Sequence, residues 1–440
     1  MKGAVIRLFI SESLSVNENG HLAIASADVV DLAKKYGTPL YIMDEDRISG
    51  ICREYVDAMR KCCGENFMVH YASKAFCTKY IYKIIDIDGM GADVVSGGEL
   101  FTAISAGFPA GKVSFHGNNK TSDEIEYALS VGVREFIVDN REELHLINRI
   151  AKEKETVANI SFRIKPGVDA HTHDFIKTGQ IDSKFGVALE NNEAFDMISE
   201  ALELSNVKLV GLHCHIGSQI FESEPFAEAA RVMIGFIAKI KNELGVKICE
   251  LNLGGGFGIR YTENDDPKNI FETVKNFTDV VKSECRKNNI DFPFLSIEPG
   301  RSVVAESGIT VYTVGSVKEI RDIRTYVSID GGMTDNPRYA LYGAEYTVLL
   351  PERPLDKKTE TVTVAGRNCE SGDLIGVDLK LPKVKAGELL AVLTTGAYNY
   401  SMASNYNRVP RPPVVMVSKG KDKLIVRRET YEDLIKNDLV

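Results

Sequence analysis

The stretch Phe67-Met-Val-His-Tyr-Ala-Ser-Lys74-Ala75 decides how the rest of the chain is interpreted. Its first six residues are mostly apolar or aromatic and predict a short strand, and a lysine follows where that strand ends. Burial at the rim of a packed core disfavours an ammonium group, and a neutral amine can form a Schiff base with an aldehyde. The alternative is that Lys74 simply extends from the strand end into solvent. The other strands of the chain must decide between the two.

Strand-like and helix-like segments alternate on both sides of this stretch, from about residue 46 to residue 300. The predicted strands are 67–72, 92–95, 113–116, 135–138, 160–165, 209–213, 248–253 and 294–297. The clearest helical segments are 122–130, 141–153, 226–244 and 270–286. Such alternation predicts parallel strands joined by crossover helices. Eight strands over about 230 residues match a (β/α)8 barrel, although an open doubly wound sheet gives the same alternation.

The residues that follow the strands favour the barrel. Polar or glycine-rich groups follow nearly every strand: Lys74, Asp93 with Glu99, His116, Asp139 with Asn140, Arg163, His215 to Ser218, Gly254 to Gly256, and Glu298 to Arg301. In a barrel all eight carboxyl ends meet at one mouth, where sites are built. An open sheet gathers its functional groups at one switch point and gives no reason for polar groups at both edges. We therefore predict a TIM-type barrel over residues 46–300.

The chain changes character after residue 301. The β-branched runs 309–317, 325–329, 359–365 and 388–393, together with Val303-Val-Ala, are separated by turns and by few helical patterns. This texture predicts a largely antiparallel β domain. Because chain ends often lie together, we expect residues 1–45 to join residues 301–440 in that domain.

Composition restricts the setting in which the protein works. The 440 residues carry 53 basic and 62 acidic side chains, and the net charge of −9 argues against a broad nucleic-acid surface. No apolar run approaches the ~20 residues of a membrane span, and the N-terminus lacks a signal-peptide pattern. The eight cysteines are scattered and are expected to be reduced thiols. We expect a cytoplasmic protein with no membrane or nucleic-acid partner.

A glycine cluster, Gly254-Gly255-Gly256, follows the seventh strand. Glycines let backbone N–H groups approach an oxyanion, as phosphate sites require, although glycine runs also form tight turns. Barrel phosphate sites commonly form after strands 7 and 8, where Glu298-Pro299-Gly300-Arg301 adds another glycine. Ser218 can donate a further hydrogen bond. Together with Lys74, this cradle indicates a phosphate-bearing aldehyde.

Histidines and one acid offer further chemistry. His213 and His215 share a strand face by spacing, but no carboxylate or cysteine stands at ligand spacing from them, so we expect no metal site. His215 stacking on a flat cofactor ring is the more useful interpretation, and a satisfied core histidine is the alternative. His171-Thr-His173 is interpreted as a polar loop. Glu298 either pairs with Arg301 or stands beside a pyridine nitrogen and keeps it protonated.

Several motifs then match one family, in order along the chain. They are 71–75 (Tyr-Ala-Ser-Lys-Ala), 163–186, 213–219 (His-Cys-His-Ile-Gly-Ser-Gln), 254–256, 298–301, 330–338 (Asp-Gly-Gly-Met-Thr-Asp-Asn-Pro-Arg), 369–373 (Cys-Glu-Ser-Gly-Asp), 396–402 and 401–412. Together they resemble the alanine-racemase-fold (fold type III) pyridoxal-phosphate decarboxylases. The resemblance covers nearly the whole chain. One departure is Tyr339, where the family usually has proline, and this places the aim of Arg338 in question.

The resemblance implies a role for each matching residue. Lys74 would anchor pyridoxal 5'-phosphate, His215 would stack on its ring, and Glu298 would face the pyridine nitrogen. The phosphate would be held by Ser218, Gly254, Gly255, Gly256, Glu298, Pro299, Gly300, Arg301 and Tyr398. The substrate would be bound by Arg301, Arg338, Tyr342, Glu370 and Tyr398. Cys369 would protonate the carbanion, and Cys369 and Glu370 would reach the partner subunit's barrel, which implies a homodimer with shared active sites.

The same residues indicate a substrate class. Arginine matches a carboxylate bidentately, and Glu370 matches an ammonium, so Arg301, Arg338 and Glu370 would together bind a second amino-acid centre. Meso-2,6-diaminopimelate has such a centre, and its decarboxylation gives L-lysine and carbon dioxide. The alternatives are decarboxylation of a related basic amino acid, a racemase on the same fold, and a non-catalytic binding protein. Cys369 in the second acid position argues against a racemase, and retention of Lys74, the glycines and Cys369 argues against a non-catalytic relic.

Overall fold

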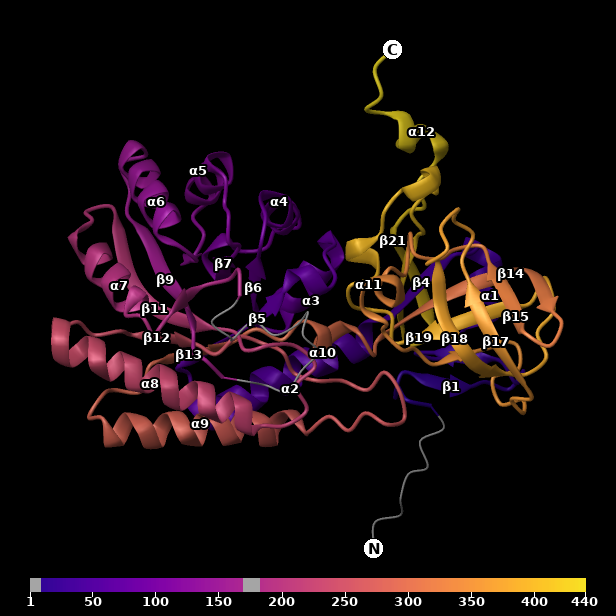
Figure 1. Cartoon of the computed structure of the whole chain (residues 1–440), viewed down its shortest axis with the longest axis horizontal. Coiled ribbons are helices and arrows are strands. Elements are labelled where there is room, and N and C mark those ends of the chain that lie inside the picture. The colour runs from indigo at the N-terminus through magenta and orange to yellow at the C-terminus, as the bar shows by residue number, and fades with distance from the viewer. Residues whose placement is uncertain (1–8, 169–182) are drawn as a thin grey trace, which may run out of the picture. The chain divides into compact units, whose positions relative to one another are not determined.

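The computed structural model describes residues 9–168 and 183–440, which form two compact units (Figure 1). The barrel unit comprises Ile51–Gly258 and Pro267–Ser302, and the β unit comprises Met1–Gly50, Ile259–Asp266 and Val303–Val440. The short segment Ile259–Asp266 therefore leaves the barrel and packs in the β unit. No sequence signal separated this segment from its surroundings.

The barrel unit is built on parallel strands that close on themselves. In chain order they are β5 (Phe67–Ala72), β6 (Gly91–Val94), β7 (Val113–Phe115), β8 (Glu135–Val138), β9 (Ala158–Lys165), β11 (Val207–Cys214), β12 (Glu250–Asn252) and β13 (Phe294–Ile297). Pairing of β13 with β5, at Leu295 and Phe67, closes the ring. A short strand, β10 (Val187–Ala188), adds to β9. The predicted barrel is confirmed, and the open sheet is excluded.

Helices alternate with these strands, as the sequence pattern predicted. They are α2 (Glu45–Cys63), α3 (Lys79–Ile87), α4 (Gly97–Ser105), α5 (Ser122–Val131), α6 (Arg141–Glu153), α7 (Glu193–Glu203), α8 (Glu224–Leu244), α9 (Ile270–Lys287) and α10 (Arg301–Val304). The helices cover the outside of the barrel and side chains fill its inside, so strands such as β6 and β8 are buried along their whole length. The β-branched run at Val303 was predicted as a strand and lies in α10 instead.

Several polar residues that follow the strands serve to start helices. Thr121 accepts a hydrogen bond from the backbone N–H of Glu124, whose side chain returns the bond and completes a capping box for α5. Asn140 caps α6 in the same way through the N–H of Glu143. Asn140 therefore follows β8 for a local reason. Not every polar strand end belongs to the barrel's site.

The β unit contains a small sheet and a larger mixed one. The small sheet joins β1 (Leu14–Val16), β2 (Leu22–Ile24) and β3 (Ala27–Asp28). The larger sheet contains β4 (Leu40–Asp44), β14 (Gly308–Ile320), β15 (Arg324–Ile329), β16 (Val348–Leu349), β17 (Glu360–Ala365), β18 (Leu374–Leu381), β19 (Leu389–Leu393), β20 (Val414–Ser418) and β21 (Lys421–Val426). Most pairings are antiparallel, while β4 with β20 and β15 with β17 are parallel.

Short helices complete the β unit, and the N-terminal strand β4 lies between β14 and β20. The helices are α1 (Val29–Tyr36), α11 (Arg338–Tyr342) and α12 (Tyr431–Ile435). Asp28 caps α1 and Gly37 ends it. Among the helices that the structure describes in either unit, each is too short or too polar to cross a lipid bilayer.

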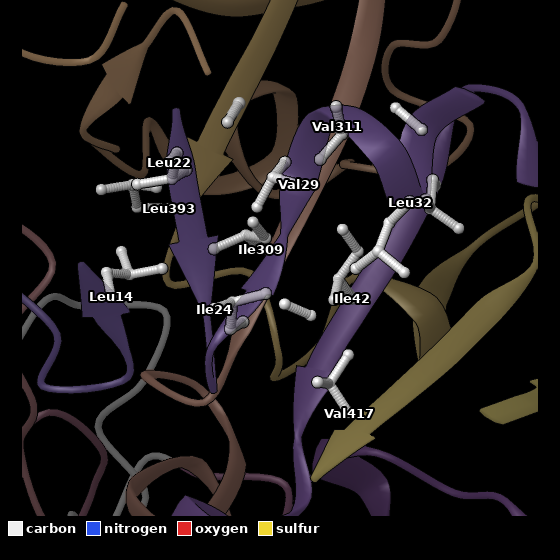
Figure 2. Close-up of a cluster of buried hydrophobic side chains, with 14 of the residues drawn as sticks. Leu14, Leu22, Ile24, Val29, Leu32, Ile42, Ile309, Val311, Leu393 and Val417 are labelled. Carbon is white, nitrogen blue, oxygen red and sulfur yellow. The ribbon is translucent and has the colours of Figure 1, made fainter. Parts of the chain in front are cut away.

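Figure 2 shows the apolar core that joins the N-terminal segment to the C-terminal strands. Leu22 and Ile24 of the small sheet, and Ile42 of β4, pack in one cluster with side chains of β14 and β19. Ile309 of β14 lies opposite Ile42 on one side and Leu393 on the other. Burial of these side chains is the main favourable contribution to the stability of the β unit.

We predict that Ile309→Ala lowers the free energy of unfolding of the β unit by about 2–5 kcal/mol, because it leaves a cavity in a packed core. Ile309 is 1% exposed, whereas Ile323, in the turn after β14, is 78% exposed. Ile323→Ala is therefore the matched control and is expected to have little effect. Urea unfolding followed by circular dichroism measures both. Equal shifts for the two variants would show that the cluster does not stabilise this unit.

Candidate active site

Lys74 lies in a single 3-10 turn, Ser73–Ala75, directly after β5. The backbone N–H of Ala72 donates to the carbonyl of Pro299, 3.1 Å away, and this bond joins the end of β5 to the segment that follows β13. A side chain at Gly300 would lie 2.7 Å from the Cβ of Ala72, so glycine permits the close approach. The side chain of Lys74 is exposed, and its amine is accessible to a small molecule.

Glu298, at the end of β13, is buried and holds polar side chains from three other strands. Its Oε1 lies 2.9 Å from Nε2 of His116 and accepts a 2.7 Å hydrogen bond from Nδ2 of Asn252. Its Oε2 lies 3.1 Å from Nε2 of His213. These partners follow β7 or lie in β12 and β11. The contacts from Asn252 and His213 are hydrogen bonds, and His116 lies at ion-pair distance. A carboxylate accepts about four hydrogen bonds, so Glu298 has room for a further donor.

The charge state of this cluster follows from its burial and its pairing. Burial opposes ionisation of Glu298, but the neighbouring His116 and His213 lower its pKa well below the ordinary value. Burial likewise opposes the charged form of His116, yet Glu298 raises the pKa of that imidazole. Burial lowers the pKa of His213 to about 4. Glu298 is therefore an anion at neutral pH, and His213 is a neutral donor.

Two further carboxyl groups lie close enough to Lys74 for its charge to affect them. Burial raises the pKa of Asp93, at β6, to about 6, and it raises the pKa of Glu99, in α4, to about 7. The positive charge of Lys74 opposes both increases. Glu99 also accepts a 2.7 Å hydrogen bond from the backbone N–H of Val95. The lysine thus stands among acids that titrate near neutral pH.

The three glycines after β12 bring separate strand ends into close contact. Gly254 and Gly256 have φ angles of 69° and 111°, which side-chain-bearing residues rarely adopt. A Cβ on Gly255 would lie 2.0 Å from the carbonyl oxygen of Glu298. Gly254 accepts a 2.8 Å hydrogen bond from the N–H of Glu298, and its own N–H donates to Asn252. The cluster therefore fixes the backbone that carries Glu298.

His215 and Ser218 lie beside this cluster. The N–H of Gly255 donates to Nδ1 of His215 at 3.2 Å, and burial lowers the pKa of His215 well below its ordinary value. Nη2 of Arg301, at the start of α10, donates to Oγ of Ser218 at 2.9 Å. A neutral flat ring and an anchored guanidinium thus border the glycine cluster, as a planar, anionic ligand requires.

In the β unit, Arg338 begins α11 and is buried. Its Nη1 donates to the hydroxyl groups of Tyr261, at 2.7 Å, and Tyr346, at 3.3 Å. The ring of Tyr398 lies 5.8 Å from its Cζ. Among residues 9–168 and 183–440, no carboxylate forms an ion pair with Arg338. Tyr339 is compatible with the short helix, and the two tyrosines determine the aim of Arg338.

Cys369 and Glu370 lie in an exposed loop that the β unit holds firmly. Asp373 accepts hydrogen bonds from the backbone N–H groups of Asn368 and Met333 at 2.7 and 2.6 Å. The N–H of Cys369 donates to Oδ1 of Asn407 at 2.7 Å. The loop therefore presents an accessible thiol on a fixed backbone. Tyr342, in α11, is also exposed.

The structure corrects one argument about the histidines. The sequence has no carboxylate at ligand spacing from His213, but the fold brings Glu298 to within 3.1 Å of it. His116, His213 and Glu298 offer ligand atoms that all lie within 4.8 Å of one another. His215 is not part of this group. His171 and His173, and the part of the 163–186 motif from 169 to 182, lie outside the described residues.

Asn252, which donates to Glu298, and Tyr261, which accepts from Arg338, belong to the candidate site although neither was predicted from the sequence. A signal existed for Asn252, because a polar residue in a buried strand two positions before the glycines is unusual. Tyr261 had none. It belongs to the segment Ile259–Asp266, whose place in the β unit depends on the tertiary structure.

The residues in the barrel unit fit pyridoxal phosphate. An accessible amine at a strand end suits an aldehyde, and Glu298 has an acceptor position left for a protonated ring nitrogen. The neutral His215 suits a ring face, and the glycines with Ser218 and Arg301 suit a phosphate. The fold and these residues thus define a barrel enzyme of the pyridoxal-phosphate class.

Comparisons with known proteins specify the class. Residues 49–305 match the family "Pyridoxal-dependent decarboxylase, pyridoxal binding domain". The chain is 47% identical to a diaminopimelate decarboxylase of Bacillus methanolicus (96% of this chain, 98% of the relative) and 46% identical to that of Bacillus subtilis strain 168 (98% of each). A crystal structure of the M. jannaschii diaminopimelate decarboxylase with L-lysine superposes with a TM-score of 0.90 at 39% identity, covering 98% of this chain and 99% of that one.

The chain belongs to the pyridoxal-dependent decarboxylase family, within the group that contains the diaminopimelate decarboxylases. It is accordingly a pyridoxal-phosphate-dependent decarboxylase, and the resemblance found in the sequence is confirmed.

We predict that Lys74 forms the covalent link to the cofactor. After reconstitution with pyridoxal phosphate and borohydride reduction, mass spectrometry should place the label on the peptide that contains Lys74. Lys74→Ala should lose both the label and the visible absorption, because no other amine occupies this strand end. Lys79→Ala, which removes an exposed lysine five residues later, should keep both. Unchanged labelling of Lys74→Ala would contradict the assignment.

Proposed function

We propose that the protein decarboxylates meso-2,6-diaminopimelate to L-lysine and carbon dioxide in lysine biosynthesis. Relatives with this name match almost the full length of both chains. L-lysine, present in the M. jannaschii structure, is what diaminopimelate becomes on losing one carboxyl group. The buried charge of Arg338 is the feature of this chain that carries the proposal.

Arg338 supports a substrate with a second carboxylate. A buried cation is stable only when a partner compensates its charge, and the hydroxyl groups of Tyr261 and Tyr346 are neutral. A carboxylate of the substrate would complete the pairing, and the planar guanidinium matches it bidentately. We assign the same end of the substrate to Arg301 and Glu370, and we assign Tyr342 and Tyr398 to substrate binding. A simple diamino monoacid would leave Arg338 without an anion.

Pyridoxal phosphate, when bound, supplies an electron sink for the carbon that loses carbon dioxide. Lys74 would hold the cofactor through its Nζ. His215 would lie against the ring, and the phosphate would be held by Ser218, Gly254, Gly255, Gly256, Pro299, Gly300, Arg301 and Tyr398. Glu298, kept anionic by its neighbours, would accept a hydrogen bond from a protonated ring nitrogen. These roles follow from the residues' chemistry and their family counterparts.

Cys369 is the proposed proton donor. Its Sγ delivers a proton to the carbon from which carbon dioxide has left, and the bond from its N–H to Asn407 fixes the loop that carries it. A racemase needs an acid–base group on each face of the ring, one to remove the proton from the α-carbon and one to return a proton, with no loss of carbon dioxide. A thiol on an exposed loop, offered from outside the barrel unit, suits a single protonation that follows decarboxylation.

A substrate panel tests the proposed function. With added cofactor, carbon dioxide release from meso-diaminopimelate should exceed that from L-lysine, L-ornithine and L-arginine by about 10⁴-fold in kcat/KM, because those substrates leave buried polar groups unpaired. Equal release from a monoacid, or racemised product without carbon dioxide, would overturn the proposal.

A variant of Arg338 tests whether this residue causes the preference for diaminopimelate. Arg338→Gln should lower the ratio of kcat/KM for diaminopimelate to kcat/KM for the monoacids. Arg324→Gln is the matched control, since this half-buried arginine of the same unit donates to Thr363. Arg324→Gln should leave this ratio of kcat/KM values unchanged.

We further propose a homodimer in which Cys369 and Glu370 complete the partner's site. Both residues are exposed in the single chain. Interfaces of closed symmetric dimers are shared reciprocally, so each site would take its lysine from one chain and its thiol from the other. The cysteines are free thiols, which supports work in a reducing compartment such as the cytoplasm.

Mixing inactive variants tests this arrangement. Lys74→Ala and Cys369→Ala, dissociated together and reassociated in equal amounts, should recover about one quarter of wild-type activity, because half of the dimers carry one intact site. Lys74→Ala mixed with Glu298→Gln is the control, because both changes fall in the barrel unit and no mixed dimer restores a site. No recovery in the first mixture would contradict shared sites.

A further inference from the structure

The partners of Glu298 point to a function beyond packing. His116, His213 and Asn252 are 5%, 1% and 6% exposed, and all three direct a side-chain nitrogen at one carboxylate. A buried carboxylate without partners would take up a proton and become neutral. The hydrogen bonds from His213 of β11 and Asn252 of β12, and the nearby imidazole of His116 after β7, oppose this. A carboxylate that only filled space would not need these contacts, so we infer that the charge of Glu298 has a function.

The geometry constrains the carboxylate in orientation as well as in charge. Asn252 and His213 occupy paired positions on the neighbouring strands β12 and β11. His116 follows β7, which is separated from β13 by β5 and β6 in the barrel, and so reaches Glu298 across the interior. The two imidazoles meet edge to face with ring centres 4.9 Å apart. Neither carboxylate oxygen can rotate away without losing a donor.

We propose that His116 and His213 are positioning residues that hold Glu298 ionised and aimed, so that Glu298 keeps the ring nitrogen of the cofactor protonated. This inference deepens the proposed function and rests on its assignment of Glu298 to that nitrogen. A protonated Glu298 would donate its hydrogen bond instead of accepting one, and the ring nitrogen would then carry no proton. The electron sink would be correspondingly weaker.

Other titratable groups lie near Glu298 in the surrounding strands. They are Asp93 of β6, His70 of β5, Arg163 of β9, and Cys214 and His215 at the end of β11. Asp93 repels a negative charge on Glu298, and Arg163 attracts one. The two imidazoles of His116 and His213 lie 2.9 and 3.1 Å from the oxygens of Glu298. The two histidines are therefore the residues to change.

The test uses holoenzyme reconstituted with pyridoxal phosphate labelled with ¹⁵N in the ring. In wild type at neutral pH, the ¹⁵N resonance should lie at the position of a protonated pyridine. In the double variant His116→Leu/His213→Leu it should move to the position of an unprotonated pyridine, and decarboxylation should fall about 10- to 100-fold, as for other outer partners of a charged ligand.

Conservative and control variants distinguish an effect on the position and charge of Glu298 from a general loss of stability. His116→Gln and His213→Gln keep an amide donor and should retain the wild-type resonance. His70→Leu is the matched control, because His70 is fully buried in the same barrel and contacts no oxygen of Glu298 among the described side chains. It should leave the resonance unchanged even if it lowers stability.

Three results would overturn the inference. The first is an unchanged protonated resonance in the double leucine variant. The second is a shift of equal size in His70→Leu. The third is stoichiometric zinc in the purified protein that His116→Gln removes, since the three side chains would then be a metal centre. The resonance is recorded without substrate, so an error in the proposed substrate would leave the readout intact.

Discussion

The negative charge of Glu298 inside the barrel is the constraint on which the rest of the structure depends. Taking a carboxylate out of water is costly unless donors replace the solvent. Here His213 of β11, Asn252 of β12 and His116, which follows β7, surround the carboxylate, so the charge can be stable only when the barrel has closed. The same closure brings the end of β5, and with it Lys74, beside the segment that follows β13. One buried anion therefore links the fold to the chemistry.

The glycines after β12 help to position that anion, because they allow the backbone of Glu298 to pack closely against them. The carbonyl of Glu298 lies where a side chain on Gly255 would have to be, and the N–H of Glu298 is held by Gly254. A larger residue at either position would displace the carboxylate from its donors. The cluster was predicted as a phosphate cradle, and it has a second task in fixing Glu298. In the β unit, Arg338 is buried at the start of α11, and Cys369 is exposed on a loop held by Asn407.

Much of this architecture could be predicted from local patterns in the chain. The apolar runs at β5, β8 and β13 were predicted with their observed bounds, because short buried strands flanked by turn residues leave few alternatives. The glycine cluster and the strand-end lysine were visible for the same reason. Val303 was misassigned, because β-branched residues were weighted above the tertiary context that makes Arg301–Val304 helical.

The parts that could not be predicted depend on contacts between distant segments. His116 and Glu298 are far apart in sequence, and only the closed barrel places them 2.9 Å from each other. Tyr261 reaches Arg338 because Ile259–Asp266 joins the β unit, which no periodicity encodes. The residue types of the candidate site could be predicted from the residues that follow the strands. The residues that contact them could be identified only from the structure.

Infrared difference spectroscopy of wild type against Glu298→Gln, at neutral pH in the unloaded protein, measures whether Glu298 is a buried carboxylate anion. We expect the substitution to remove a carboxylate stretching band and no carbonyl band of a protonated acid. Loss of a protonated-acid band, with the carboxylate region unchanged, would contradict it.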